Sequence, residues 1–124
     1  MLLTNKEMLQ SVEPLQSIFG QKMPAKTAFR VAAVIRTINC ALETYQTVLD
    51  KVLSDFSERD AAGNIVRVNG VPQISDQLSF SDRVEALLEQ TIHIPGEKIS
   101  VDDLGTNVIV EPSSVALLGW LLLE

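Results

Sequence analysis

One long hydrophobic pattern dominates the chain between Pro24 and Phe56. Apolar side chains recur there at alternating intervals of three and four residues, which places them on one stripe of an α-helix. We call this stripe the seam; its members are Ala28, Val31, Ile35, Ile38, Leu42, Tyr45, Leu49, Val52 and Phe56. No glycine or further proline interrupts the run, and Pro24 suits a first helical turn, where no N–H is needed. The pattern predicts one continuous amphipathic helix over 24–56.

This helix is long for so small a protein. At 1.5 Å per residue it extends about 50 Å, whereas a compact chain of 124 residues has a diameter of about 35 Å. Val34, Ala41 and Val48 also widen the seam on one flank. Cover can come from a helical hairpin within one chain or from self-association, and we favour self-association. The predicted oligomer interface consists of Val31, Ile35, Ile38, Leu42, Tyr45, Leu49, Val52, Phe56 and Trp120.

A first helix precedes the long one. Thr4 and Glu7 fit a capping box, in which each side chain satisfies a free backbone N–H. Apolar residues follow at helical spacing up to Phe19, and Gly20 ends the pattern. Pro14 predicts a kink or a restart within this helix. The connection over 21–23 is short, so the two helices should pack antiparallel.

The pattern changes after Phe56. Two short apolar runs, 65–68 and 71–74, flank Asn69–Gly70, the commonest type I′ turn, and predict a β-hairpin. Another helix should start near Ser79 or Ser81. Its predicted buried face consists of Phe80, Val84, Leu87 and Leu88, and Thr91 is a further candidate.

The last third of the chain contains short apolar runs. Ile92–Ile94 predicts a strand that Pro95 ends, and 99–101 and 108–110 indicate further extended pieces. Pro112 opens a last apolar helix that reaches Leu122. We therefore predict an α+β fold, mainly α, in one domain over 1–124. Its parts are an antiparallel helical hairpin (1–57), a β-hairpin (62–75) and a region of helix, short strands and C-terminal helix (79–124).

Composition narrows the function classes. Hydrophobic residues make up 46% and charged residues 21% of the chain, as in folded soluble proteins. A formal net charge of −6 argues against non-specific nucleic-acid binding, which needs surplus Lys and Arg. The single cysteine, Cys40, allows no internal disulfide and suits a reducing cytoplasm. The N-terminus does not resemble a signal peptide, and the apolar tail 115–123 is too short to span a bilayer. We expect no membrane contact.

No residue pattern points to catalysis. His93 is the only histidine and stands between two isoleucines in a predicted strand. Asp102–Asp103 has no third metal ligand nearby in the sequence, and no nucleophile elbow or phosphate loop occurs. We expect a protein that is not an enzyme, with no catalytic residues, no metal and no cofactor.

Basic residues cluster around the start of the long helix. Lys22, Lys26 and Arg30 follow one another every four residues, and Arg36 comes shortly after. The positive end of the helix dipole adds to their potential. They are candidate ligands for an anionic molecule such as a nucleotide, at a site completed by neighbouring subunits. The alternative is a solvated face that balances the excess of Asp and Glu.

Several short motifs resemble one family. They are Met1 with Leu3–Glu7, the Met23–Lys26 stretch with Arg30, Asp60 with Gly63–Asn64, Ile99 with Asp102–Leu104, and the apolar tail ending in Glu124. The chain is similar, over most of its length, to small bacteriophage and prophage proteins of unknown function. The resemblance implies a phage origin and a long helical pair with a small β element. It implies no catalytic residues.

Two functions are consistent with these observations. The first is a non-enzymatic, phage-encoded oligomeric interaction protein: a component of the virion or its assembly, or a modulator of a host protein. The second is an anti-defence protein that sequesters an anionic nucleotide signal between subunits. Either role is expected in the host cytoplasm or the virion.

Overall fold

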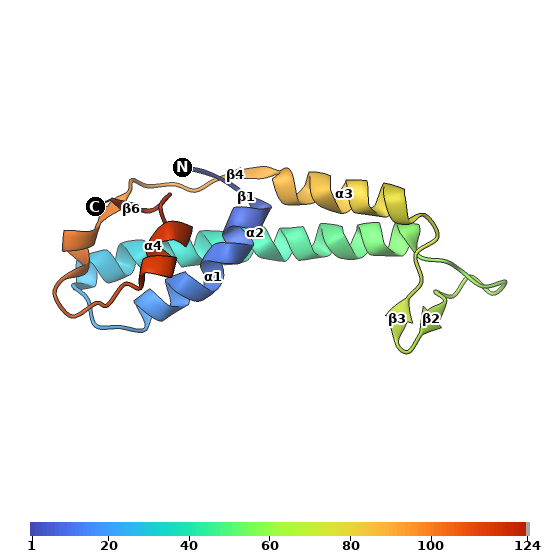
Figure 1. Cartoon of the computed structure of the whole chain (residues 1–124), viewed down its shortest axis with the longest axis horizontal. Helices are drawn as coiled ribbons and strands as arrows, with labels where there is room; N and C mark the ends of the chain where they lie inside the picture. The colour runs from blue at the N-terminus through green and yellow to red at the C-terminus, as the bar shows by residue number, and fades with distance from the viewer. Residues whose placement is uncertain (124) are drawn as a thin grey trace.

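A single unbroken helix runs the length of the molecule. The structure is a computed structural model that describes residues 1–123; Glu124, which ends the predicted apolar tail, lies outside the described residues. The long helix, α2 (Ala25–Phe56), has 32 residues; the other helices are arranged along it, and a β-hairpin lies at its C-terminal end (Figure 1). Pro24 is its N-cap, with φ −56° and ψ 142°, so the helix begins one residue after the predicted start at Pro24. The predicted mainly α fold with small β elements is confirmed.

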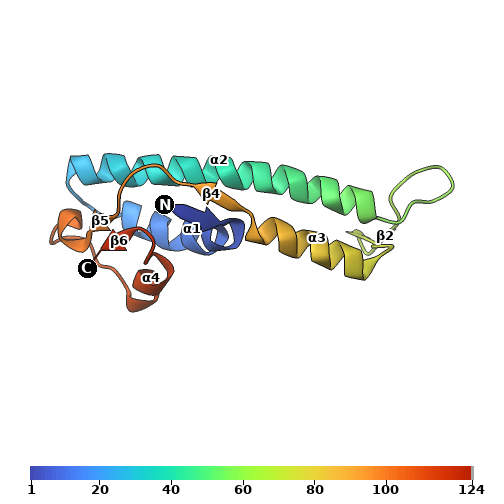
Figure 2. The ribbon, with the colours of Figure 1, turned by 90° about the horizontal axis from the view of Figure 1, so that it is seen from above.

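The elements around α2 form two parts of unequal thickness. The head contains residues 1–45 and 90–123. The arm contains residues 46–89, which form the rest of α2, the β-hairpin and a further helix, α3 (Gln77–Glu89), and projects from the head (Figures 1 and 2). The molecule is therefore elongated, which is how it accommodates a helix of this length.

The first helix, α1 (Asn5–Phe19), packs against α2 within the head (Figure 2). The capping box is confirmed: the Glu7 amide donates to Thr4 Oγ1 at 3.1 Å, and the Thr4 amide donates to Glu7 Oε1 at 3.0 Å. Pro14 lies inside α1 without ending it, so the predicted restart is wrong. A proline in a helix removes one backbone hydrogen bond, and burial of Leu15 and Ile18 beside it holds the helix together.

Distant parts of the chain meet in the head core. β1 (Leu2–Thr4) pairs antiparallel with β4 (Thr91–His93), and β5 (Ile99–Ser100) pairs in parallel with β6 (Leu122–Leu123). Between these strands and the helices lies one cluster of buried side chains. It includes Leu3, Met8, Leu15, Ile18, Val31, Val34, Ile38, Ile94, Ile99, Leu104, Leu118 and Leu121. The core thus takes residues from the beginning, the middle and the end of the sequence.

Three expectations for the last third of the chain need correction. After β5 the chain turns into a 3-10 helix, η1 (Val101–Leu104), instead of continuing as a strand. Residues 108–110 form no strand; the side-chain amide of Gln21 pairs with the backbone N–H and C=O of Ile109 at 2.7 and 2.8 Å and takes the place of a neighbouring strand. The last helix, α4 (Pro112–Leu117), stops early because β6 pairs with β5.

The arm ends in the predicted hairpin. β2 (Arg67–Val68) and β3 (Val71–Pro72) are joined by Asn69 and Gly70, whose φ values of 53° and 79° fit a type I′ turn. Two isolated bridges, Ser57–Ile74 and Arg59–Ile65, continue the pairing towards the end of α2. α3 (Gln77–Glu89) then runs back along α2 to the head, where the Asn5 side chain donates to the Leu87 carbonyl at 2.7 Å.

The start of α3 depends on Asp76, which the sequence did not suggest as a cap. Its side chain accepts a hydrogen bond from the Ser79 amide at 3.1 Å, and α3 begins two residues before the predicted Ser79. Hydrogen bonds from the backbone and side chain of Ser79 lower the pKa of the Asp76 carboxyl below its ordinary value of 3.8.

Replacing Asp76 with alanine should lower the melting temperature at neutral pH, because the first turn of α3 loses its cap. The folded-state pKa is lowered, so the charged cap stabilises the fold above the unfolded-state pKa, and this stabilisation is lost as the pH falls through the folded value. Thermal unfolding followed by circular dichroism at several pH values should therefore show the wild type and Asp76→Ala converging in acid. A difference that is constant with pH would contradict this role for the carboxylate.

Candidate functional site

The arm is incompletely covered along its whole length. In α2 no side chain after Tyr45 is buried, and α3 contains no buried side chain at all. The apolar residues that face one another across the arm are only half-buried: Leu49, Val52, Leu53 and Phe56 of α2, and Phe80, Val84, Leu87 and Leu88 of α3. Two helices cover one stripe on each other and leave both flanks of that contact open, whereas bundles of more helices bury such stripes.

Aromatic contacts hold the far end of the arm. The Phe56 and Phe80 rings meet edge to face with centroids 6.2 Å apart, and the guanidinium carbon of Arg83 lies 6.0 Å from the Phe56 centroid. These contacts are worth about 1 kcal/mol each. They align α3 with α2, but the apolar flanks of the arm stay accessible.

The predicted oligomer interface divides between the two parts of the molecule. Val31, Ile38 and Tyr45 are 2%, 1% and 9% exposed and belong to the chain's own interior. Their prediction as contacts between subunits is therefore wrong. Ile35, Leu42 and Trp120 are half-buried against the same core, and the Trp120 Nε1–H donates to Ser11 Oγ at 3.0 Å. Leu49, Val52 and Phe56 lie in the arm, where the seam stays partly open. The seam is thus covered by α1 and the C-terminal segments in the head and by α3 alone in the arm.

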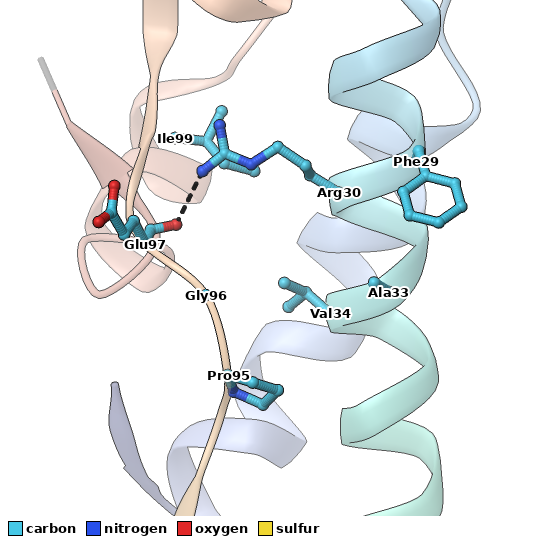
Figure 3. A pocket seen from close by; sticks show the side chains of 8 residues that line it. All are labelled: Phe29, Arg30, Ala33, Val34, Pro95, Gly96, Glu97 and Ile99. Atoms are coloured by element: carbon cyan, nitrogen blue, oxygen red, sulfur yellow. Dashed lines mark hydrogen bonds between the residues drawn. The ribbon is translucent and has the colours of Figure 1, made fainter.

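A small cavity opens beside α2 on the head. It has a volume of about 130 Å³ and lies between one side of α2 and the segment that follows β4 (Figure 3). Its lining consists of Phe29, Arg30, Ala33, Val34, Pro95, Gly96, Glu97 and Ile99. The Arg30 guanidinium donates to the carbonyl of Glu97 at 3.2 Å and to that of Lys98 at 3.4 Å, which fixes the outer wall of the cavity.

The sequence did not indicate this cavity. Phe29 lies at the rim of the cavity, and its side chain is 76% exposed. In the sequence, an aromatic residue next to the seam indicates a helix but no cavity. In the sequence, Pro95 and Gly96 indicate only the end of a strand. The signal that could have identified the cavity is the combination of an apolar residue outside the seam with a proline–glycine segment that cannot pair as a strand.

The four candidate anion ligands do not converge. Arg30 is occupied by backbone carbonyls, and Lys22 lies in the connection before α2, beside a shallow hollow next to Gly105. Lys26 is exposed one turn before Arg30. Arg36 comes six residues after Arg30, which places it about 120° around the helix. Nucleotide binding at a site shared between subunits stays a prediction.

Within residues 1–123, no cluster of three or more His, Cys, Asp or Glu side chains is placed to hold a metal ion. No helix in this part of the chain is both long and apolar enough to cross a membrane. Cys40 is exposed on α2. The features that stand out for interaction are therefore the open flanks of the arm and the cavity on the head.

Comparison with known proteins gives no guide to the role of these features. No family model, curated protein or solved structure matches the chain. The resemblance to phage proteins stays a prediction that rests on the short motifs. The surface itself has to indicate the function.

Proposed function

We propose that this protein is a non-enzymatic, phage-encoded interaction protein that self-associates through its arm. It would act in the host cytoplasm or the virion, as a component of the virion or its assembly, or as a modulator of a host protein. The observation that carries the proposal is the state of the arm: a run of apolar side chains on two helices that is half-buried even where α1 meets the head end of α3.

Energetics support a partner for this surface. Each Å² of apolar surface removed from water contributes roughly 25 cal/mol, so the open flanks of α2 and α3 represent stabilisation that a single chain leaves unused. A second copy that lies along the arm would remove these flanks from water, as neighbouring helices do for such stripes in bundles. The hairpin at the end of the arm, with Val68 and Val71 at 53% and 60% exposed, would then remain available for another partner.

Size-exclusion chromatography with light scattering tests the proposal. We expect a molar mass of at least twice 13.6 kDa, with dissociation on dilution. A monomer mass at every accessible protein concentration would overturn self-association, since a half-open apolar arm would then be stable alone. The elongated shape alone makes a monomer elute early, so elution volume is not a sufficient readout.

A further inference from the structure

One flank of α2 carries complementary features at its two ends. Val34, Ala41 and Val48 are spaced by seven residues and therefore lie on the same side of the helix. At the head end, Val34 forms part of the wall of the cavity. At the arm end, Val48 is 38% exposed, although it is a large apolar side chain. Between them, Ala41 presents only a methyl group.

The cavity matches one aliphatic side chain in size and chemistry. An apolar cavity of about 150 Å³ accommodates benzene, so about 130 Å³ accommodates the isopropyl group of a valine. Pro95, Val34 and Ile99 supply apolar walls (Figure 3). At its edge, the carbonyls of Glu97 and Lys98 already accept hydrogen bonds from Arg30. Such a site favours an apolar group over an ion.

Charge changes sign along the same helix. Within 25–42, α2 contains Lys26, Arg30 and Arg36 and no acidic residue. Within 43–56 it contains Glu43, Asp50 and Asp55, against Lys51 alone. Two such helices attract each other when they lie antiparallel, because the net positive half of each then lies alongside the net negative half of the other. Lys26, Arg30 and Asp55 lie on the same side of the helix as Ala41. Arg36, Glu43 and Asp50 lie on the opposite side and act only at longer range. In a parallel pair, like charges would face each other.

We propose that α2 of a second copy lies antiparallel along this flank, with the two-fold axis near Ala41 and Val48 of each copy in the cavity of the other. The inference rests on the proposed self-association and specifies its geometry. Val34 comes seven residues before Ala41, and Val48 comes seven residues after it. An antiparallel pair centred on Ala41 therefore places Val34 of each copy beside Val48 of the other. The same surface is used on both copies, and the assembly closes as a dimer. Lys26 comes close to Asp55 of the second copy, a residue that also pairs with Lys51 of its own chain at 3.1 Å.

The contact gives specific expectations for substitutions. Val48→Asp should weaken the dimer at least about tenfold, because a carboxylate would enter an apolar cavity. Ala33→Leu, which fills the cavity from the head, should weaken it similarly without touching the arm. Thr47→Asp is the matched control: it introduces the same charge one residue away, on an exposed face, and should leave the dimer unchanged. Sedimentation equilibrium measures the three dissociation constants, and circular dichroism verifies that each variant is folded.

Distances between spin labels test the geometry directly. Cys40 is the only cysteine, is exposed, and neighbours the proposed axis, so labels on the wild type should lie close together in the dimer. A label at Lys51→Cys on a Cys40→Ser background should lie about 30 Å from its counterpart, because ten residues separate it from the axis in each copy. Lys51 is 75% exposed and tolerates a label.

Each outcome has a definite meaning. A short distance at Cys40 with a long one at position 51 supports the antiparallel contact. Short distances at both positions mean a parallel pair, and long distances at both mean a contact elsewhere; either result overturns this inference and leaves the proposed self-association standing. A monomer mass with no measurable label–label distance would overturn both. Dimerisation of Val48→Asp and Ala33→Leu with wild-type affinity would also exclude the cavity as the contact.

Discussion

Replacing Ile38 with alanine should lower the free energy of unfolding by about 3–4 kcal/mol, the usual cost of emptying a well-packed site. Ile38 is 1% exposed and lies where α1, α2 and the C-terminal segments meet. Its removal leaves a cavity that several elements of the head share, so relaxation of one of them cannot close it. Urea unfolding followed by circular dichroism measures the loss.

The neighbouring residue supplies the control for this prediction. Asn39→Ala changes an exposed position on the same helix turn and should alter the free energy of unfolding by no more than about 0.5 kcal/mol. A loss below about 1 kcal/mol for Ile38→Ala would mean that the head is less tightly packed than its burial indicates. Measurements need one fixed protein concentration, because self-association adds to apparent stability.

Hydrogen exchange should divide the molecule into a slow head and a fast arm. At low protein concentration we expect amides in α3 to exchange about 100-fold faster than those around Leu15 and Ile38, which corresponds to about 3 kcal/mol of local opening free energy. The cause is burial: α3 has no buried side chain, whereas the head contains a continuous core. Mass spectrometry of peptides from 77–89 and 5–19 provides the comparison.

The same experiment reports on association. If a second copy covers the arm, protection of α3 and of α2 after Tyr45 should increase with protein concentration, whereas protection of α1 should stay constant. Equal protection of head and arm in the dilute monomer would contradict the assignment of the arm as the less stable part. A concentration effect restricted to α1 would place the contact on the head.

The elements that the sequence predicted correctly are those determined by residues close together in the chain. The spacing of the seam specified α2, the Thr4–Glu7 pair specified the start of α1, and Asn69–Gly70 specified the hairpin turn. In each case the residues that determine the structure lie within one turn or one heptad of each other. The seam also indicated that α2 must be covered, and the structure shows α1, the C-terminal segments and α3 beside it.

Pairing between distant segments could not be predicted in this way. β1 is three residues long and is defined by Leu3 facing Ile92, far away in the sequence. The leucine-rich end of the chain has the composition of a helix. Because Leu122 pairs with Ile99, residues 122–123 form a strand instead. The cavity on the head likewise depends on where residues 95–99 pass α2. Patterns within α2 could not reveal which partner segment lies beside it.

The position of the head elements along the sequence affects how the protein is made. β4, η1 and α4 are synthesised after the whole of α2, so Val31 and Ile38 leave the ribosome long before Leu104, Leu118 and Leu121. At about 5–20 residues per second this interval lasts several seconds. During that time, α1 is the part of the nascent chain that packs against the beginning of α2. A chaperone that binds apolar helices should therefore engage ribosome-bound chains that end between α3 and α4, and release them once Leu122 has emerged.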